Sequence, residues 1–343
     1  MEKEQTNLTI DSQLLNRNFK WLVTGVAGFI GSNILEQLLK LNQSVIGIDN
    51  FATGKKSNLL DVESCVGKDR WRNFNFVNLD LRDELGCMRV CEDVDFVIHQ
   101  AALGSVPRSV KNPLLTNSVN VTGFLNLLYA AKEAGCRNFT YASSSSVYGD
   151  STSLPKKEEK IGSPLSNYAL TKLTNEQYSE VFSRTYDFHP IGLRYFNVFG
   201  RRQDPIGEYA AVIPKWIVAR LNGEDIEING DGTTSRDFCF VERVVQANIS
   251  ASLKGGRTSS EVINVGMGQK TDLNTLLGHI DKILERRGVK IRGKVVYKDF
   301  RVGDVKHSLA DLTKLKRELR LDREFDFYES LQNTIEWYIE KYS

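Results

Sequence analysis

The sequence predicts an α/β protein, with a doubly wound parallel sheet followed by a smaller, mixed α/β C-terminal domain. Three observations support this prediction. Short apolar runs alternate with helical stretches over the first 200 residues, a glycine-rich turn follows the first run, and the pattern becomes less regular after Gly200. Continuous apolar strands separated by helices are typical of a parallel sheet covered on both faces.

The elements follow in order along the chain. Six apolar runs are the expected strands of the sheet: 21–24, 45–48, 74–77, 96–98, 139–142 and 191–195. Residues 29–41 form the first expected helix, because Ile30, Ile34, Leu35, Leu38 and Leu39 share one face. Beyond Gly200 we expect helices at 213–221, 271–287, 310–319 and 328–342, and a strand at 225–228.

These elements divide the chain into two expected domains. Residues 1–199 form the nucleotide-binding domain, with a returning segment around 237–265, and residues 200–343 form the substrate domain. No Pro/Gly-rich linker separates the two parts, so they should pack closely. The cleft between them is then the natural ligand site.

Composition excludes several classes of protein. The net charge of the 343 residues is only +2, whereas a nucleic-acid-binding protein normally carries a basic stripe. No apolar run reaches the roughly 18 residues that a membrane-spanning helix needs, and the polar start lacks the apolar core of a signal peptide. The five cysteines include no CxxC pair, so we expect free thiols and a cytoplasmic location.

A glycine-rich turn directly follows the first strand. Gly25, Gly28 and Gly31 form a G-x-x-G-x-x-G pattern that opens the first helix. Glycines at these positions permit a tight turn and bring the helix N-terminus against a pyrophosphate. Because the turn lies between a strand and a helix, it predicts a dinucleotide-binding (Rossmann) domain.

Acidic residues at two strand ends indicate which dinucleotide binds. Asp49 ends the second strand, where a carboxylate accepts both ribose hydroxyls and repels a 2′-phosphate, which favours NAD over NADP. Lys55 and Lys56 lie beyond the strand end and are interpreted as solvated loop charges. Asp80 and Leu81 either hold the adenine, or Asp80 simply caps the next segment.

The four histidines are scattered and show no metal-binding spacing, so we expect no metal site. His99 is interpreted as a packed histidine at the end of the fourth strand. The small residues Ala101 and Ala102 that follow it suit a backbone lying against a cofactor.

A tyrosine, a lysine and a run of serines form the candidate catalytic set. Tyr168 and Lys172 are four residues apart and share one helix face. The serines 143–146 end the fifth strand, and the carboxyl ends of parallel strands face the ligand crevice. The alternative is a surface Tyr–Lys pair beside a capping serine cluster.

To act as a base near neutral pH, Tyr168 needs its pKa lowered from about 10 to about 7. This shift requires about 4 kcal/mol of preference for the phenolate. A lysine about 6 Å away supplies roughly 3 kcal/mol at an effective dielectric near 20. The positive ring of oxidised nicotinamide can supply the rest. The pair is therefore sufficient to abstract a hydroxyl proton, with a serine hydroxyl steadying the same oxygen.

Together these residues resemble the extended short-chain dehydrogenase/reductase family over nearly the whole chain, and within it the bacterial UDP-N-acetylglucosamine 4-epimerases. The closer resemblance is carried by HQAALGSVPRS (99–109), GLRYFNVFGRRQDP (192–205), YAAVIPKW (209–216) and FRVGDVKHS (300–308). It implies a homodimer with NAD as cofactor and a product used in polysaccharide biosynthesis.

The resemblance implies a role for individual residues. Tyr168 is the base, Lys172 its electrostatic partner and Ser144 the catalytic hydroxyl. The residues expected to bind the UDP-sugar are Ser105, Ser144, Ser145, Ser146, Asn197, Gln203, Ala211, Val212, Trp216, Asn229, Arg236, Arg301, Asp304 and Ser308. Those expected to bind NAD are Gly25, Gly28, Phe29, Ile30, Gly31, Asp49, Asn50, Phe51, Thr53, Gly54, Asp80, Leu81, Gln100, Ala101, Ala102, Tyr168, Lys172, Tyr195 and Val198.

Three positions bear on specificity or depart from the family pattern. Ser308 replaces a bulky aromatic of the plain-hexose epimerases, which leaves room for an N-acetyl group; its alternative role is a helix N-cap. Ser143 stands where an alanine is expected. Glu227 stands where close relatives carry an aromatic beside the nucleotide.

The expected reaction is reversible inversion at C4 of a UDP-N-acetylhexosamine through a 4-keto intermediate, with uronic acids and plain hexoses as further substrates. One rival is a nucleotide-sugar 4,6-dehydratase or decarboxylase, but Ser145 and Ser146 occupy the place of the dehydratase acid/base pair. A second rival is a non-catalytic NAD-sensing protein, which tends to lose the Tyr/Lys pair. Helices around 117–134 and 168–186 are expected to pair across a two-fold axis as a four-helix bundle; full burial within one subunit is the alternative.

Overall fold

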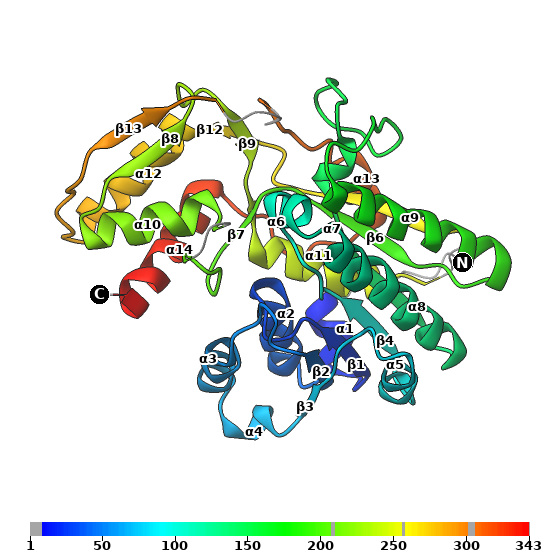
Figure 1. Cartoon of the computed structure of the whole chain (residues 1–343). Helices are drawn as coiled ribbons and strands as arrows, with labels where there is room; N and C mark the ends of the chain where they lie inside the picture. The colour runs from blue at the N-terminus through cyan, green and yellow to red at the C-terminus, as the bar shows by residue number, and fades with distance from the viewer. Residues whose placement is uncertain (1–8, 207–209, 256–257, 301–305, 343) are drawn as a thin grey trace, which may run out of the picture.

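The computed structural model describes residues 9–206, 210–255, 258–300 and 306–342. Within these ranges seven parallel strands form one sheet, in the spatial order β11-β6-β5-β4-β1-β2-β3 (Figure 1). The strands are β1 (Lys20–Thr24), β2 (Ser44–Asp49), β3 (Phe74–Asn78), β4 (Phe96–His99), β5 (Asn138–Ser144), β6 (Ile191–Tyr195) and β11 (Glu261–Val265). The predicted doubly wound parallel sheet is confirmed.

Helices cover both faces of this sheet. One face packs against α2 (Phe29–Lys40) and α11 (Val241–Leu253), and its core includes Trp21, Ile34 and Ile249. The other face packs against α5 (Glu84–Cys91), α8 (Gly123–Glu133) and α9 (Asn167–Tyr186), around Phe124 and Phe139. Shorter helices connect these layers: α3 (Lys56–Val66), α4 (Lys68–Trp71), α6 (Val106–Lys111), α7 (Pro113–Asn117) and α13 (Thr313–Glu318).

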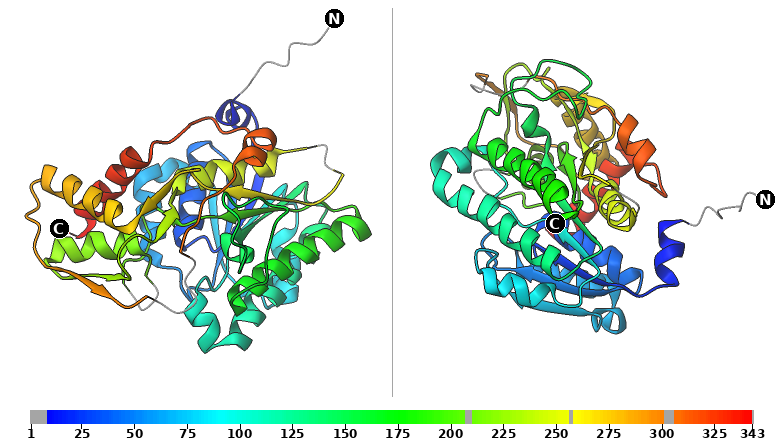
Figure 2. Two further views of the ribbon diagram at one scale, coloured as in Figure 1. Left: turned by 90° about the horizontal axis from the view of Figure 1, so that it is seen from above. Right: turned by 90° about the vertical axis from the view of Figure 1, so that its right-hand side faces the viewer.

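The C-terminal part has its own apolar core, between α10 (Val212–Asn222), α12 (Leu273–Arg286) and α14 (Phe327–Tyr342). Figure 2 shows this part set beside the sheet. Three strand pairs border it: β8 (Ile226–Asn229) with β13 (Val295–Lys298), β9 (Ser235–Asp237) with β12 (Lys270–Asp272), and β7 (Val198–Phe199) with β10 (Cys239–Phe240). In the described ranges no helix is long and apolar enough to cross a membrane.

One local expectation from the sequence is corrected, and one element is added. The polar start contains a short helix, α1 (Ile10–Leu15), whose Ile10 and Leu14 are buried in the sheet core. The helix expected at 310–319 begins only at Thr313. Asp311 accepts a hydrogen bond from the Thr313 N–H, so Ser308 is not an N-cap and lies in the strand-like segment before the helix.

Candidate active site

Several of the predicted site residues lie at the carboxyl edge of the sheet. β1 lies between β2 and β4, so the chain order reverses at this point and opens the crevice in which such sheets bind ligands. Thr24 at the end of β1 is paired in register with His99 at the end of β4. Ser144 at the end of β5 is paired with Tyr195 at the end of β6.

The glycine turn between β1 and α2 leaves no room for side chains. A Cβ on Gly25, whose φ is +66°, would lie 2.8 Å from the backbone nitrogen of Ala101. A Cβ on Gly31 would lie 2.1 Å from the carbonyl oxygen of Gly25. Gly28 is the N-cap of α2 and has no side chain that could accept hydrogen bonds from the N–H groups of the first turn. Phe29 and Ile30 are the first two residues of this turn. This uncapped helix end fits the diphosphate of a dinucleotide.

Asp49 is held at the end of β2 by backbone donors. Its carboxylate accepts hydrogen bonds from the N–H groups of Ala27 at 3.0 Å and Phe51 at 2.8 Å. Burial raises the pKa of Asp49, and these donors oppose the rise. Gly54 packs so closely that a Cβ there would lie 2.7 Å from the carboxylate, whereas Thr53 beside it is exposed. The carboxylate therefore has a fixed position at the crevice.

Two charged side chains near Asp49, Lys55 and Asp80, form ion pairs that the sequence did not indicate. Lys55, interpreted as a solvated loop charge, forms an ion pair with Asp204 at 2.8 Å. Asp80 accepts hydrogen bonds from Asn50 and from both the backbone and the guanidinium of Arg82. These bonds to Arg82 lower the pKa of Asp80 to about 2. Asp80 therefore closes a local turn, and α5 is capped instead by Asp83.

Gln100 and Tyr195, both predicted at the cofactor, are linked through Asn248, which no sequence pattern singled out. The Tyr195 hydroxyl contacts Gln100 Oε1 at 3.1 Å and Asn248 at 2.8 Å. Gln100 Nε2 also donates to Asn248 Oδ1 at 3.0 Å. Asn248 lies on α11 and is fully buried. Thr24 Oγ1 accepts from the N–H groups of Gln100 and Ala101, which fixes the loop that continues to Ala102.

Ser144 has its hydroxyl oriented by a neighbour. Its oxygen accepts hydrogen bonds from the backbone N–H of Ser146 at 3.1 Å and from the Ser146 hydroxyl at 2.9 Å. The Ser144 hydroxyl also lies near the phenol of Tyr168 and lowers its pKa, which favours the phenolate. Ser145 and Ser146 continue the same short 3₁₀ turn and are partly exposed.

Tyr168 is placed by the first turn of α9. Ser166 caps this helix, and the Tyr168 N–H donates to the buried hydroxyl of Ser109 on α6 at 3.1 Å. Lys172 lies one turn further, with its Nζ 6.0 Å from the centre of the Tyr168 ring. The same Nζ donates a 2.8 Å hydrogen bond to the carbonyl of Ala142 on β5. The predicted serine, tyrosine and lysine are thus brought together.

The electrostatic balance at this cluster differs from the expectation. Burial raises the pKa of Tyr168, and the hydrogen bond from Ser144 only partly opposes it. Burial also lowers the pKa of Lys172 to about 8, against the opposing attraction of Glu176. The spacing of Tyr168 and Lys172 in the sequence predicts that a phenolate and an ammonium would attract each other at about 6 Å. It does not show that both groups are buried, and burial disfavours the charged form of each.

Several residues expected to bind the sugar nucleotide lie at helix starts or on the short strands of the C-terminal part. Ser105 caps α6, and Ala211 and Val212 open α10. Arg236 on β9 donates to the carbonyls of Ser235 and Lys306, and the Ser308 N–H donates to the same Ser235 carbonyl. Asn229 ends β8, beside the exposed Glu227, which lies 3.4 Å from Lys298 Nζ.

The remaining expected substrate residues have varied surroundings. Asn197 is exposed and its carbonyl accepts from Cys239, while Gln203 Nε2 donates to the carbonyl of Val198. Gln203 Oε1 is buried with no hydrogen-bond partner among the described residues. Trp216 is packed in the C-terminal core and is only 3% exposed. Arg301 and Asp304 lie outside the described residues.

Asn120 is a site residue that the sequence patterns did not reveal. It lies in a π-helical turn (Ser118–Thr122) between α7 and α8 and is almost fully buried. Its amide accepts from the N–H of Leu103 at 2.8 Å and donates to the Thr171 hydroxyl beside Lys172 at 3.2 Å. Asn120 thereby ties the loop after β4 to α9, which carries Tyr168 and Lys172. Such π-turns are frequent at functional sites, but no sequence pattern marks them.

The described part of the chain contains no group of three His, Cys, Asp or Glu side chains that could hold a metal ion. His99 is buried and packed against Phe124 and Phe139, with Nδ1 2.8 Å from Thr24 Oγ1. Burial lowers the pKa of His99 to about 3, so the ring is neutral at physiological pH.

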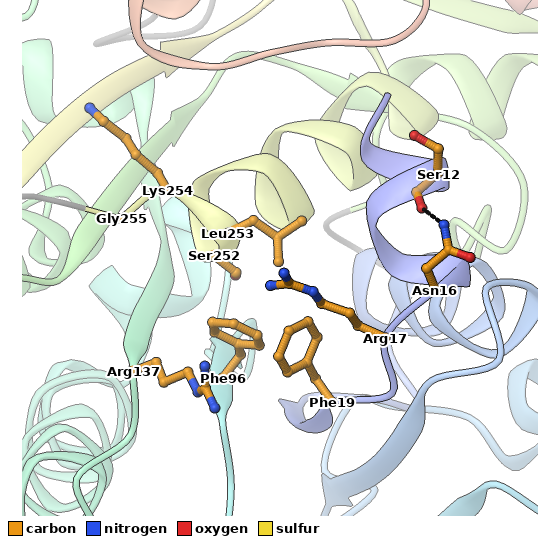
Figure 3. Close-up of a pocket in the computed structure, with 10 residues that line it drawn as sticks. All are labelled: Ser12, Asn16, Arg17, Phe19, Phe96, Arg137, Ser252, Leu253, Lys254 and Gly255. Carbon is orange, nitrogen blue, oxygen red and sulfur yellow. Dashed lines mark hydrogen bonds between the residues drawn. The ribbon is translucent and has the colours of Figure 1, made fainter. Parts of the chain in front are cut away.

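A cavity of about 560 Å³ lies at the opposite edge of the sheet and is not part of this site (Figure 3). It is lined by Phe19 and Phe96, whose rings are 5.1 Å apart, where β1 and β4 begin. Two of its cations are already paired: Arg137 with Asp95, and Lys254 with acidic residues of β11 and α13. The chemistry is therefore assigned to the carboxyl edge.

Fold and site together define a dinucleotide-binding protein in which Ser144, Tyr168 and Lys172 converge at the carboxyl edge of the sheet. The sequence model of the "NAD dependent epimerase/dehydratase family" matches residues 21–266. The chain therefore belongs to this family, and NAD is its cofactor.

Individual relatives agree with this assignment. The UDP-glucuronate 4-epimerase of Thermodesulfobacterium geofontis is 35% identical over 324 residues, covering 92% of this chain and 95% of the relative. The UDP-N-acetylglucosamine 4-epimerase of Methanobrevibacter ruminantium, solved with UDP-N-acetylmuramic acid, is 39% identical, with a TM-score of 0.86 over 95% of this chain and 99% of the other. The UDP-glucose 4-epimerase of Thermotoga maritima, solved with UDP-glucose, is 35% identical, with a TM-score of 0.84 over 94% and 100%.

Proposed function

We propose that this protein is a UDP-sugar 4-epimerase that acts preferentially on UDP-N-acetylhexosamines and interconverts UDP-GlcNAc and UDP-GalNAc. The observation that carries the proposal is the convergence of Ser144, Tyr168 and Lys172 beside the glycine cradle. The relatives described above, named as 4-epimerases of UDP-glucose, UDP-glucuronate and UDP-N-acetylglucosamine, support the reaction class.

The reaction needs an oxidant for C4 of the sugar. NAD, when bound, would supply this chemistry as acceptor and donor of a hydride at C4. The groups proposed to hold it are the cradle of Gly25, Gly28 and Gly31, the carboxylate of Asp49, and the linked pair Gln100 and Tyr195.

Three side chains manage the proton of the 4-hydroxyl. Tyr168 removes it as the general base and returns it after the sugar has turned over in the pocket. Ser144 donates a hydrogen bond to the Tyr168 phenol and is oriented for this by Ser146. Lys172 places a positive charge 6.0 Å from the ring, which stabilises the phenolate against the effect of burial. Because the reaction involves no net oxidation or reduction, the enzyme would need no added reductant to catalyse repeated cycles.

The preference for an acetylated sugar rests on Ser308. The Ser308 N–H is fixed to the Ser235 carbonyl beside Arg236, so its small side chain borders the proposed substrate region. A bulky aromatic there would fill the space proposed for the N-acetyl group. The structural relative named as a UDP-N-acetylglucosamine 4-epimerase supports this preference.

A substrate panel tests both parts of the proposal. UDP-Glc, UDP-GlcNAc and UDP-GlcNAcA are supplied separately to the wild type and to Ser308→Tyr, without added reductant. We expect conversion of UDP-GlcNAc by the wild type and selective loss of the acetylated activities in the variant. Equal loss with all three sugars would contradict the role of Ser308, and no conversion of any sugar would contradict the reaction class.

We also propose that two copies associate through the helices around 117–134 and 168–186, which are mainly α8 and α9. Tyr129 on α8 is 40% exposed, and Leu170 and Val181 on α9 are each 53% exposed on the same side of the sheet. A second copy that presents the same face would bury these side chains in a four-helix arrangement. Light scattering should give a dimer mass that Val181→Glu converts to a monomer. Leu60→Glu, which changes an exposed leucine on α3, is the control and should leave the dimer intact.

A cytoplasmic location is part of the same proposal. All five cysteines are free thiols, which suits a reducing compartment. There the product would serve polysaccharide biosynthesis. Genetic deletion followed by sugar analysis of cell-surface polymers would check this: loss of the C4-inverted amino sugar is expected, and an unchanged sugar composition would contradict it.

A further inference from the structure

The catalytic helix carries a third ionisable group in line with Tyr168 and Lys172. Glu176 follows Lys172 by four residues, so the three side chains succeed one another along one face of α9. Residues four positions apart on a helix are neighbours, and Glu176 attracts the Lys172 ammonium electrostatically. Neither the catalytic role of Tyr168 nor the binding of either ligand accounts for this buried carboxylate.

Lys172 needs such a partner. Its side chain is 2% exposed, and its Nζ has a hydrogen bond to one neutral acceptor, the carbonyl of Ala142. A buried ammonium loses its proton unless a negative charge lies nearby. Lys172 is useful to Tyr168 only while it is charged.

The ionisable groups packed around this position come from four elements. They are Tyr168 and Glu176 on α9, His99 at β4, Tyr141 on β5 and Arg194 on β6. His99 is neutral, because burial lowers its pKa to about 3, and burial also keeps Tyr141 protonated by raising its pKa. Arg194 is positive. Glu176 is therefore the one negative charge in this set of described residues.

Glu176 is held firmly in this position. Arg194 donates to both of its carboxylate oxygens, at 2.9 Å and 2.8 Å, and the Ser143 hydroxyl donates to one of them at 2.5 Å. Arg194 is itself fixed by a bond to the carbonyl of Glu158 and by the ring of Tyr148, 4.9 Å away. Ser143 is the residue that stands where the family pattern has alanine, and here it provides a further donor to this carboxylate.

We propose that Glu176 is a positioning residue that holds Lys172 in its charged form beside Tyr168 and so sets the pH range of catalysis. The proposal rests on the proposed function for the identity of the base. The carboxylate lies between two cations, Lys172 and Arg194, and both are needed: Arg194 fixes Glu176, and Glu176 retains the proton of Lys172.

This arrangement predicts how both limbs of the pH–rate profile respond to Glu176→Gln. Without the carboxylate, Lys172 loses its proton at lower pH, so the alkaline limb moves down by roughly one pH unit. Tyr168 then loses part of its electrostatic support, so the acid limb moves up. The active range narrows from both sides, whereas a purely structural role would lower the rate without moving either limb.

Two variants serve as controls. Glu176→Asp retains the charge and should restore most of the wild-type range. Asp281→Asn removes the partner of another buried arginine, Arg220, whose Nε lies 2.8 Å from Asp281 in the C-terminal part. It should lower the melting temperature to a similar extent but leave both limbs in place. If Glu176→Gln does not fold, the double variant Glu176→Gln/Arg194→Gln removes the uncompensated arginine and replaces it in the comparison.

A second readout separates this inference from the identity of the substrate. The phenolate absorbance of Tyr168 is titrated in the NAD-loaded protein, with Tyr168→Phe subtracted as the background. We expect Glu176→Gln, or the double variant, to raise the pKa of Tyr168 by roughly one unit. An unchanged Tyr168 titration together with unmoved limbs would overturn the inference. Failure of every UDP-sugar to react would overturn the proposed function instead, and the titration would still decide the role of Glu176.

Discussion

Replacing Lys172 by Met tests how much the buried ammonium contributes to proton abstraction. The Lys172 Nζ lies 6.0 Å from the centre of the Tyr168 ring. At an effective dielectric near 20, two unit charges at this distance attract by about 3 kcal/mol. This energy corresponds to about two pKa units of the phenol, so the rate at neutral pH should fall about 100-fold.

The assay compares initial rates of UDP-GlcNAc conversion over a range of pH. Because burial lowers the pKa of Lys172 to about 8, the wild type should lose activity as the pH rises through this value. Lys172→Met should be slow throughout and should lack this alkaline limb. Lys172→Arg keeps the charge and should lose much less activity.

Thermal unfolding provides the control for folding. Lys172→Met loses one hydrogen bond to Ala142 but also removes a buried charge, so its stability should change by only about 1 kcal/mol. A folded variant that keeps more than a third of the wild-type rate would refute the electrostatic role. A variant that retains the alkaline limb would show that another group titrates there.

Two further predictions concern stability and cofactor binding. Glu36 is buried, which alone would raise its pKa, but Arg201 and Arg202 outweigh burial and lower it from 4.5 to about 2. A depressed carboxyl pKa stabilises the fold above the unfolded value, so about 3 kcal/mol should be lost as the pH falls from 4.5 towards 2. Urea unfolding should show this loss of stability in the wild type but not in Glu36→Gln. Equal acid sensitivity of the two proteins would contradict the role of Glu36. Gly31→Ala should reduce retained NAD at least tenfold, because the new Cβ would lie 2.1 Å from the Gly25 carbonyl oxygen. Gly278→Ala on α12, where a Cβ meets nothing within 4 Å, is the control, and equal NAD content in both variants would count against the cradle.

The sheet was predictable because most of its strands, the edge strand β3 excepted, are buried on both faces. Runs such as the one that ends at Thr24 are short and almost wholly apolar, which is typical of strands covered by helices on either side. The short helix α1 was not predictable, because Ile10 and Leu14 are the two apolar residues among its described side chains that face the core. Its connection to β1 is instead held by Gln43, whose amide bonds to the carbonyls of Leu14, Arg17 and Leu41.

The convergence of the three candidate catalytic side chains was predictable from chain position. Strand ends and one helix face bring Ser144, Tyr168 and Lys172 together, and the sequence displays both features. Burial was not predictable, and it reverses the expected direction for Tyr168. The contacts of Asn120 with Leu103 and of Glu176 with Arg194 join residues more than 15 positions apart, which local patterns do not contain.

The most direct measurement is the conversion of UDP-GlcNAc by the purified, NAD-loaded protein without added reductant, alongside Tyr168→Phe. The wild type should produce UDP-GalNAc and should reach the same mixture from either sugar. Tyr168→Phe should fold normally and lose at least 100-fold in rate, because the general base is gone. No interconversion by the wild type, or equal rates in both proteins, would contradict a UDP-N-acetylhexosamine 4-epimerase that acts through Tyr168.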